Sequence, residues 1–150
     1  MAEERASVGR LMGVDYGSQR IGLALSDPLG IIAQPLETIP NDPNTVSAIV
    51  KLSSQQGVVG VVVGMPLNLK GEIGAKAKEV EAFIQTLKEN LDIDVVCWDE
   101  RFTSTIAQHT LRSMGTTKRQ RREDKGRIDA MAAALILQSF LDRTKHSRTC

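Results

Sequence analysis

Aromatic side chains are scarce in this sequence, in which Phe, Trp and Tyr together make up 3% of the 150 residues. Recognition of nucleic acid through stacked bases needs a platform of aromatic side chains, so we do not expect that mode here. No apolar run approaches the roughly 20 residues that cross a bilayer, and none near the N-terminus resembles a signal peptide. The two cysteines, Cys97 and Cys150, have neither the spacing of a metal site nor that of a disulfide framework. We therefore expect a soluble, cytoplasmic protein in a reducing compartment, with no membrane partner.

An excess of charge of one sign is also absent, since 19 Lys and Arg residues face 18 Asp and Glu residues, for a net charge of +1. The field of the whole molecule therefore indicates no polyanionic partner, and only local clusters of charge can do so. The apolar and charged fractions, 41% and 25%, are ordinary globular values. We predict a single domain over residues 1–150, with a core of about 10–142 and mobile termini.

The hydrophobic pattern predicts a mixed α/β fold. Period-two alternation indicates strands, a helical spacing of apolar residues indicates helices, and the run 58–63 is apolar on both faces, as in a covered strand. We expect a five-stranded sheet, three antiparallel strands followed by two parallel ones, flanked by helices. The predicted strands are 11–15, 21–25, 31–36, 58–63 and 94–98, and the predicted helices run from Pro43 to Gly57, from 75 to 91, from Thr103 or Ser104 to Gly115, and from 128 to 141.

Carboxylates stand where these elements end. Asp15 ends the first strand on the same face as Leu11 and Gly13, and Asp99 and Glu100 follow the fifth strand. Converging carboxylates repel one another by several kcal/mol unless divalent cations lie among them. Oxygen ligands favour Mg²⁺ or Mn²⁺, and a pair of such ions can hydrolyse phosphodiesters.

Asp129, in the first turn of the last predicted helix, faces the sheet and completes this group. We take Asp15, Glu100 and Asp129 as the catalytic and metal-binding residues. Strand alternation lets only one of Asp99 and Glu100 face the site; Glu100 has the longer side chain, and Asp99 stays a possible partner.

Structural readings of the same acids stay open. Asp15 can cap a hairpin turn, Asp129 can stabilise a helix N-terminus, and Glu100 can pair with Arg101. The basic run 118–127, next to Asp129, can hold phosphates or be a solvated loop. The candidate nucleic-acid contacts are Ser18, Arg20, Lys70, Arg101, Lys118, Arg119, Arg121, Arg122 and Arg127.

Short motifs in a fixed order closely resemble the YqgF/RuvX family over about residues 10–142. They are Gly13-Val14-Asp15-Tyr16-Gly17, Arg20-Ile21-Gly22, Gly64-Met65-Pro66-Leu67, Asp99-Glu100-Arg101-Phe102-Thr103-Ser104 and Ile128-Asp129-Ala130-Met131-Ala132-Ala133. The only departures are Phe102 and Ser104, where leucine and threonine are common in the family.

The resemblance implies an RNase H-like fold, with the family's acidic residues at Asp15, Glu100 and Asp129. It also implies a nuclease that processes the 5′ end of pre-16S rRNA during ribosome biogenesis, or alternatively a Holliday junction resolvase. A third possibility is a non-catalytic RNA-binding factor of ribosome assembly. The hairpin Asp15-Tyr16-Gly17-Ser18 also looks like the phosphate hairpin of actin-like ATP-binding proteins, but those need a second similar domain. We expect pre-rRNA or branched DNA as the partner, and a monomer or homodimer.

Overall fold

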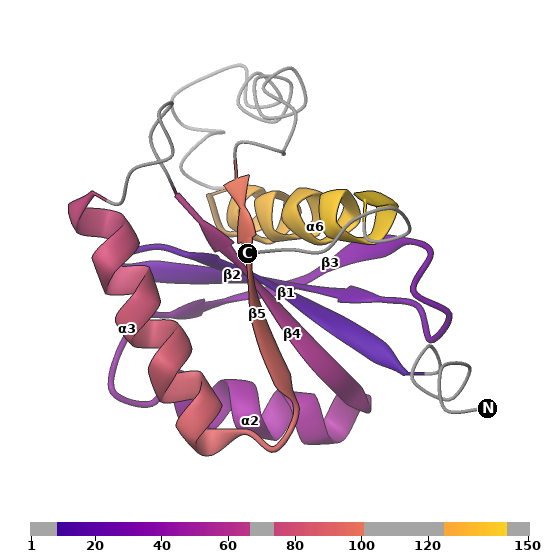
Figure 1. Cartoon of the computed structure of the whole chain (residues 1–150), viewed down its shortest axis with the longest axis horizontal. Coiled ribbons are helices and arrows are strands. Elements are labelled where there is room, and N and C mark those ends of the chain that lie inside the picture. The colour runs from indigo at the N-terminus through magenta and orange to yellow at the C-terminus, as the bar shows by residue number, and fades with distance from the viewer. Residues whose placement is uncertain (1–8, 67–73, 101–124, 144–150) are drawn as a thin grey trace.

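The computed structural model describes residues 9–66, 74–100 and 125–143. They form one five-stranded sheet in the order β3-β2-β1-β4-β5 with helices on both faces (Figure 1). The strands are β1 (Arg10–Tyr16), β2 (Arg20–Ser26), β3 (Ala33–Pro40), β4 (Val58–Met65) and β5 (Asp94–Asp99), and the helices are α2 (Thr45–Gln56), α3 (Ala75–Asn90) and α6 (Lys125–Arg143).

The strand directions confirm the predicted sheet. β2 runs antiparallel to both β1 and β3, because tight turns reverse the chain between them. β4 runs parallel to β1 and to β5, because a helix precedes each of β4 and β5 and carries the chain back across the sheet. This connectivity brings the carboxyl ends of β1, β4 and β5 to one end of the molecule.

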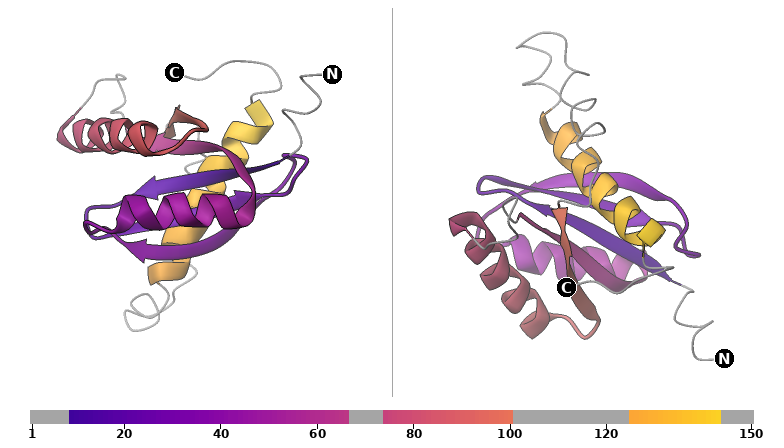
Figure 2. Two further views of the ribbon diagram at one scale, coloured as in Figure 1. Left: turned by 90° about the horizontal axis from the view of Figure 1, so that it is seen from below. Right: turned by 45° about the horizontal axis from the view of Figure 1, so that its top comes forward.

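Two apolar layers hold the helices on the sheet. On one face Ile49 of α2 and Phe83 of α3 belong to the same buried apolar cluster as Met12 and Val14 of β1. On the other face α6 packs against Trp98 and the middle of β4. The two views in Figure 2 show α2 and α6 on opposite sides of the sheet. Alternation along β1 therefore turns Met12 and Val14 towards α2 and α3, and Asp15 towards α6.

Some predicted boundaries are wrong. The third strand begins at Ala33, because Ile31 and Ile32 donate their backbone N–H groups to the Asp27 carboxylate and stay in the preceding loop. The first helix begins at Thr45, beyond the proline predicted to open it. The last helix begins at Lys125, so that Asp129 lies in its second turn and is not the predicted first-turn acid.

Three further predictions concern a helix, the cysteines and the lack of a membrane span. The helix expected after Thr103 or Ser104 lies outside the described residues. Cys97 is disulfide-bonded, so the expectation of no bridge is wrong for this residue. Across the described ranges, every helix is too short or too polar to cross a membrane.

Candidate active site

Glycines let α6 lie directly on the sheet. A Cβ at Gly13 would come within 2.7 Å of Leu137 Cβ and 2.8 Å of the Ala133 carbonyl oxygen. A Cβ at Gly22 would collide with the carbonyl group of Asp129. With only hydrogen atoms at these positions, the helix backbone reaches the strands. The start of α6 is thereby fixed above β2.

This contact brings two distant acids to one place. Gly22 on β2 is the register partner of Asp15 on β1. Because the Asp129 backbone lies over Gly22, Asp15 and Asp129 meet at the same end of the sheet, on the same face.

Glu100 reaches that face from β5. A Cβ at Gly64 of β4 would lie 3.0 Å from Glu100 Cγ and 3.2 Å from its Cδ, so the Glu100 side chain extends over β4. Trp98 belongs to the apolar layer beneath α6, and strand alternation turns the buried Asp99 to the opposite face. Glu100, and not Asp99, therefore shares the face of Asp15.

The negative charges of Glu100 and Asp129 both act on Asp15. Burial, the nearby Glu100 and, more weakly, Asp129 raise the pKa of Asp15 from 3.8 to about 7. Burial, aided by the charge of Asp99, also raises the pKa of Glu100. In both cases the cation of Lys76 opposes the rise. The site is thus an anionic cluster that lacks enough positive charge to balance it.

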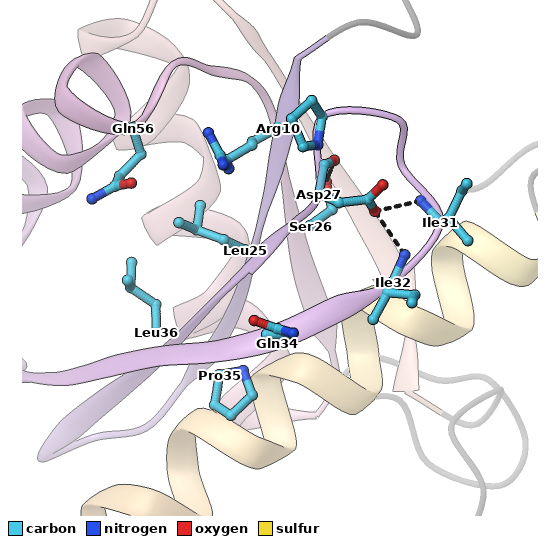
Figure 3. Close-up of a pocket in the computed structure, with 11 residues that line it drawn as sticks. Arg10, Leu25, Ser26, Asp27, Ile31, Ile32, Gln34, Pro35, Leu36 and Gln56 are labelled. Carbon is cyan, nitrogen blue, oxygen red and sulfur yellow. Dashed lines mark hydrogen bonds between the residues drawn. The ribbon is translucent and has the colours of Figure 1, made fainter.

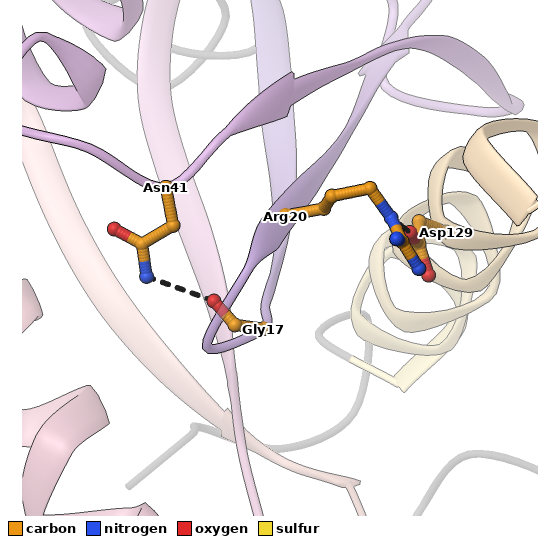
Figure 4. A network of polar contacts seen from close by, with 4 residues as sticks. All are labelled: Gly17, Arg20, Asn41 and Asp129. Carbon is orange, nitrogen blue, oxygen red and sulfur yellow. Dashed lines mark hydrogen bonds and ion pairs between the residues drawn. The ribbon is translucent and has the colours of Figure 1, made fainter.

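Asp129 has a direct cationic partner. Arg20 Nε donates to Asp129 Oδ2 at 2.7 Å, from β2 to α6 (Figure 4). In the adjoining turn, Asn41 Nδ2 donates to the Gly17 carbonyl oxygen at 2.8 Å, which holds the hairpin before Arg20. Arg20, which stays a predicted nucleic-acid contact, pairs with one of the acids in this structure.

A divalent cation requires several oxygen ligands close together. The side chains at this end are carboxylates, whose oxygens suit a hard cation such as Mg²⁺. Within residues 9–66, 74–100 and 125–143, however, no three His, Cys, Asp or Glu side chains lie close enough together to hold a metal ion as they stand. Asp15 and Glu100 fit an ion through their uncompensated charge, while Asp129 is engaged by Arg20.

The remaining predicted contacts are placed only in part. Ser18 is exposed in the β1–β2 turn, next to the acid cluster. The backbone of Arg127 lies in the first turn of α6. The other predicted contacts lie outside the described residues: Lys70, Arg101, Lys118, Arg119, Arg121 and Arg122. The side chain of Arg127 is also not described.

Lys76 is a residue that the sequence reasoning missed. It stands four residues before Val80 and seven before Phe83, both on the buried stripe of α3. A lysine at helical spacing with an apolar stripe was the signal that could have identified it.

A hollow of about 450 Å³ lies at the other end of the sheet (Figure 3). Its walls include Arg10, at the start of β1, together with Ser26 and Gln34. None of Asp15, Glu100 and Asp129 lines it. We therefore do not place the chemistry of the protein there.

The chain is similar in sequence to one protein family. A family model described as "RuvX: Holliday junction resolvase" matches residues 9–143. A Sulfurihydrogenibium protein named "Putative pre-16S rRNA nuclease" is 41% identical over 142 residues, which are 93% of this chain and 94% of that protein. A protein of the same name from Acetivibrio thermocellus is 42% identical over 137 residues, covering 89% and 95% of the two chains.

Solved structures show the fold. Thermus thermophilus RuvC in complex with a Holliday junction substrate aligns with a TM-score of 0.60 at 15% identity, covering 95% of this chain and 99% of RuvC. The fowlpox virus Holliday junction resolvase aligns with a TM-score of 0.52 at 12% identity, covering 90% and 99%. At such identities the likeness establishes the fold alone, which is RNase H-like, as predicted.

Proposed function

This chain belongs to the RuvX family of nucleases, and on that premise we propose that it is a divalent-metal-dependent nuclease that cleaves pre-16S rRNA near its 5′ end. The observation that carries the proposal is the gathering of Asp15, Glu100 and Asp129 at one end of the sheet. Burial and neighbouring negative charge raise the pKa of Asp15 there to about 7. A protein keeps such an unfavourable cluster where bound cations offset it.

Each acid has a role in this proposal. Asp15 on β1 and Glu100 after β5 lie on the same face of the sheet and would hold the ion, with Asp129 as a third ligand once its carboxylate leaves Arg20 and moves closer. In the structure Arg20 pairs with the Asp129 carboxylate and therefore competes with the ion for it. When bound, a divalent cation activates water for attack on phosphorus and stabilises the leaving oxygen.

The substrate follows from the relatives. Two relatives that each cover about nine-tenths of this chain carry the name of a pre-16S rRNA nuclease. A four-way DNA junction is the second candidate, favoured by the description of the matching family model. Such a role places the protein in the cytoplasm, with structured nucleic acid as its partner.

Cleavage assays on both substrates test the proposal. Labelled precursor 16S rRNA and a synthetic four-way junction are incubated with the protein in Mg²⁺, in Mn²⁺ and in a chelator. Wild type should cleave, and the Asp15→Asn variant should not. Asp142→Asn removes the same charge at an exposed position near the other end of α6, and this variant should cleave as wild type does.

Two results would overturn the proposal. Cleavage by Asp15→Asn as fast as by wild type, or undiminished cleavage in the chelator, would show that the carboxylates and the metal are not required. Tight RNA binding with no cleavage in either metal would instead favour a non-catalytic RNA-binding factor.

A further inference from the structure

Lys76 lies at the sheet-facing side of α3, where the apolar contacts of this helix end. It precedes Val80 and Phe83 by four and seven residues, which places all three on one side of the helix. The Phe83 ring packs against that of Tyr16 in a tilted arrangement, with ring centroids 4.9 Å apart. Tyr16 follows Asp15 directly. Two turns before Phe83 the Lys76 side chain is exposed, beyond the apolar layer.

The charge of Lys76 acts on both unpaired acids. It is the cation that opposes the rise in the pKa of Asp15 and of Glu100. Among the described residues Lys76 forms no ion pair with either of them, in contrast to Arg20, which pairs with Asp129. The start of α3 follows the carboxyl end of β4, and Lys76 lies on the side of α3 that carries the Phe83–Tyr16 contact. Its ammonium group therefore lies at the end of the sheet that carries the acids, where another anion can reach it.

A nucleic-acid strand entering this site needs such a cation. Its phosphates approach three carboxylates, which repel them, and further negative charge develops on the phosphoryl oxygens during hydrolysis. The long, flexible side chain of a lysine brings a point charge to a phosphate. The N-terminus of α3, one residue away, adds a partial positive charge at the same place.

We propose that Lys76 contacts the phosphate of the substrate strand beside Asp15 and Glu100, as a further catalytic residue of this nuclease. This inference rests on the function proposed above. Lys76 takes no part in proton transfer: water attacks phosphorus, the electron pair of the cleaved P–O bond leaves with the leaving oxygen, and the proton of the water does not pass to Lys76. Its part is to bind the phosphate and to stabilise the charge that develops there.

Lys78 provides the matched control. It lies in the same turn of α3 and is exposed, but two residues along a helix correspond to about 200°, so it points away from the sheet. Lys76→Gln and Lys78→Gln remove the same charge from the same turn. Lys76→Gln should lower kcat/KM by about 100-fold, mainly through kcat. Lys78→Gln should stay within about twofold of wild type, and Lys76→Arg should recover most of the lost rate.

Two results would refute the role of Lys76. The first is an equal loss of kcat/KM for Lys76→Gln and Lys78→Gln, which would show that the effect comes from the net charge of the protein and not from the position of Lys76. The second is a loss of activity that follows the loss of thermal stability and is not restored by Lys76→Arg.

Binding measurements separate a failure of this inference from a failure of the proposed function. In the Asp15→Asn background, Lys76→Gln should weaken binding of the labelled junction and RNA, and reduce the salt dependence of binding by about one unit. If wild type does not cleave, the proposed function fails. The affinities of the Lys76→Gln and Lys78→Gln variants still show whether Lys76 contacts the nucleic acid. Equal affinities for Lys76→Gln and Lys78→Gln would then overturn the inference.

Discussion

Arg20 Nε lies 2.7 Å from Asp129 Oδ2 and joins residues that are 109 positions apart in the chain. The pair links β2 to the start of α6 and gives Asp129 the counter-charge that Asp15 lacks. The two side chains are 34% and 25% exposed, so water screens their attraction. Their contribution to stability is therefore small, and their main effect is on the charge of the site.

Arg20 competes with the divalent cation for the Asp129 carboxylate, and removal of Arg20 should end this competition. In Arg20→Gln the freed carboxylate becomes available to the cation, and the concentration of Mg²⁺ for half-maximal cleavage should fall severalfold. The metal-free protein should lose about 1 kcal/mol or less of unfolding free energy. Arg10→Gln, at the far end of the neighbouring strand, is the matched control. An unchanged or higher Mg²⁺ requirement in Arg20→Gln would contradict this prediction.

Asp15 should make stability in the absence of metal depend on pH. Its pKa is 3.8 in an unfolded chain and about 7 in the folded protein, mainly because of burial. The folded state therefore binds more protons between these values, so stability falls as pH rises through this interval. At about 1.4 kcal/mol per pKa unit, reduced because water reaches this partly exposed side chain, the loss by pH 8 is on the order of 2 kcal/mol.

Asp15→Asn removes that loss. In a chelator, urea denaturation should show Asp15→Asn to be more stable than wild type at pH 8, with the difference vanishing near pH 4. Mg²⁺ should stabilise wild type more at pH 8 than at pH 5. Parallel pH profiles for the two proteins would rule out the burial of charge inferred here.

Gly22 sets the height of α6 above the sheet. Gly22→Ala places a methyl group against the Asp129 carbonyl oxygen, so the helix must move. We expect a loss of roughly 2 kcal/mol or more in unfolding free energy, together with a large loss of cleavage as Asp129 shifts. At Gly74 a Cβ meets no atom within 4 Å, and Gly74→Ala should cost less than about 1 kcal/mol. Similar stability of the two variants would argue against the close packing.

Asp27 organises the far end of the sheet. Its carboxylate accepts hydrogen bonds from the backbone N–H groups of Ile31 and Ile32 (Figure 3) and from that of Leu29. The hydrogen bond from Ile32 is the largest influence that lowers the pKa of Asp27. Because its folded-state pKa is lowered, the stabilisation is present above the unfolded pKa and is lost as pH falls below it.

Asp27→Ala should therefore lower the melting temperature at neutral pH while leaving the rate of cleavage unchanged. Thermal denaturation of Asp27→Ala and wild type at pH 7 and pH 3 checks this, and the difference should be smaller at pH 3. A defect in cleavage at a temperature where the variant is folded would place this loop in the catalytic machinery.

Local sequence patterns predicted most of the fold. The helix over Ala75–Asn90 was expected at 75–91, because its apolar residues recur at helical spacing and pack on one side. The directions of all five strands were also predicted correctly, since short turns impose antiparallel pairs and intervening helices impose parallel ones. The predicted start of the third strand was wrong because the Asp27 carboxylate accepts hydrogen bonds from the backbone N–H groups of the two residues before Ala33.

The sequence by itself determined which acids stand at the ends of strands and on the sheet-facing side of the last helix, because burial repeats with the period of each element. Only the tertiary structure decided which positive charges lie near each of these acids. Asp129 pairs with Arg20, whereas Asp15 and Glu100 are both influenced by the charge of Lys76. This difference depends on how closely α6 and α3 approach the sheet. The approach of α6 is fixed by contacts such as that at Gly22, between segments more than a hundred residues apart, which periodicity within one segment does not encode.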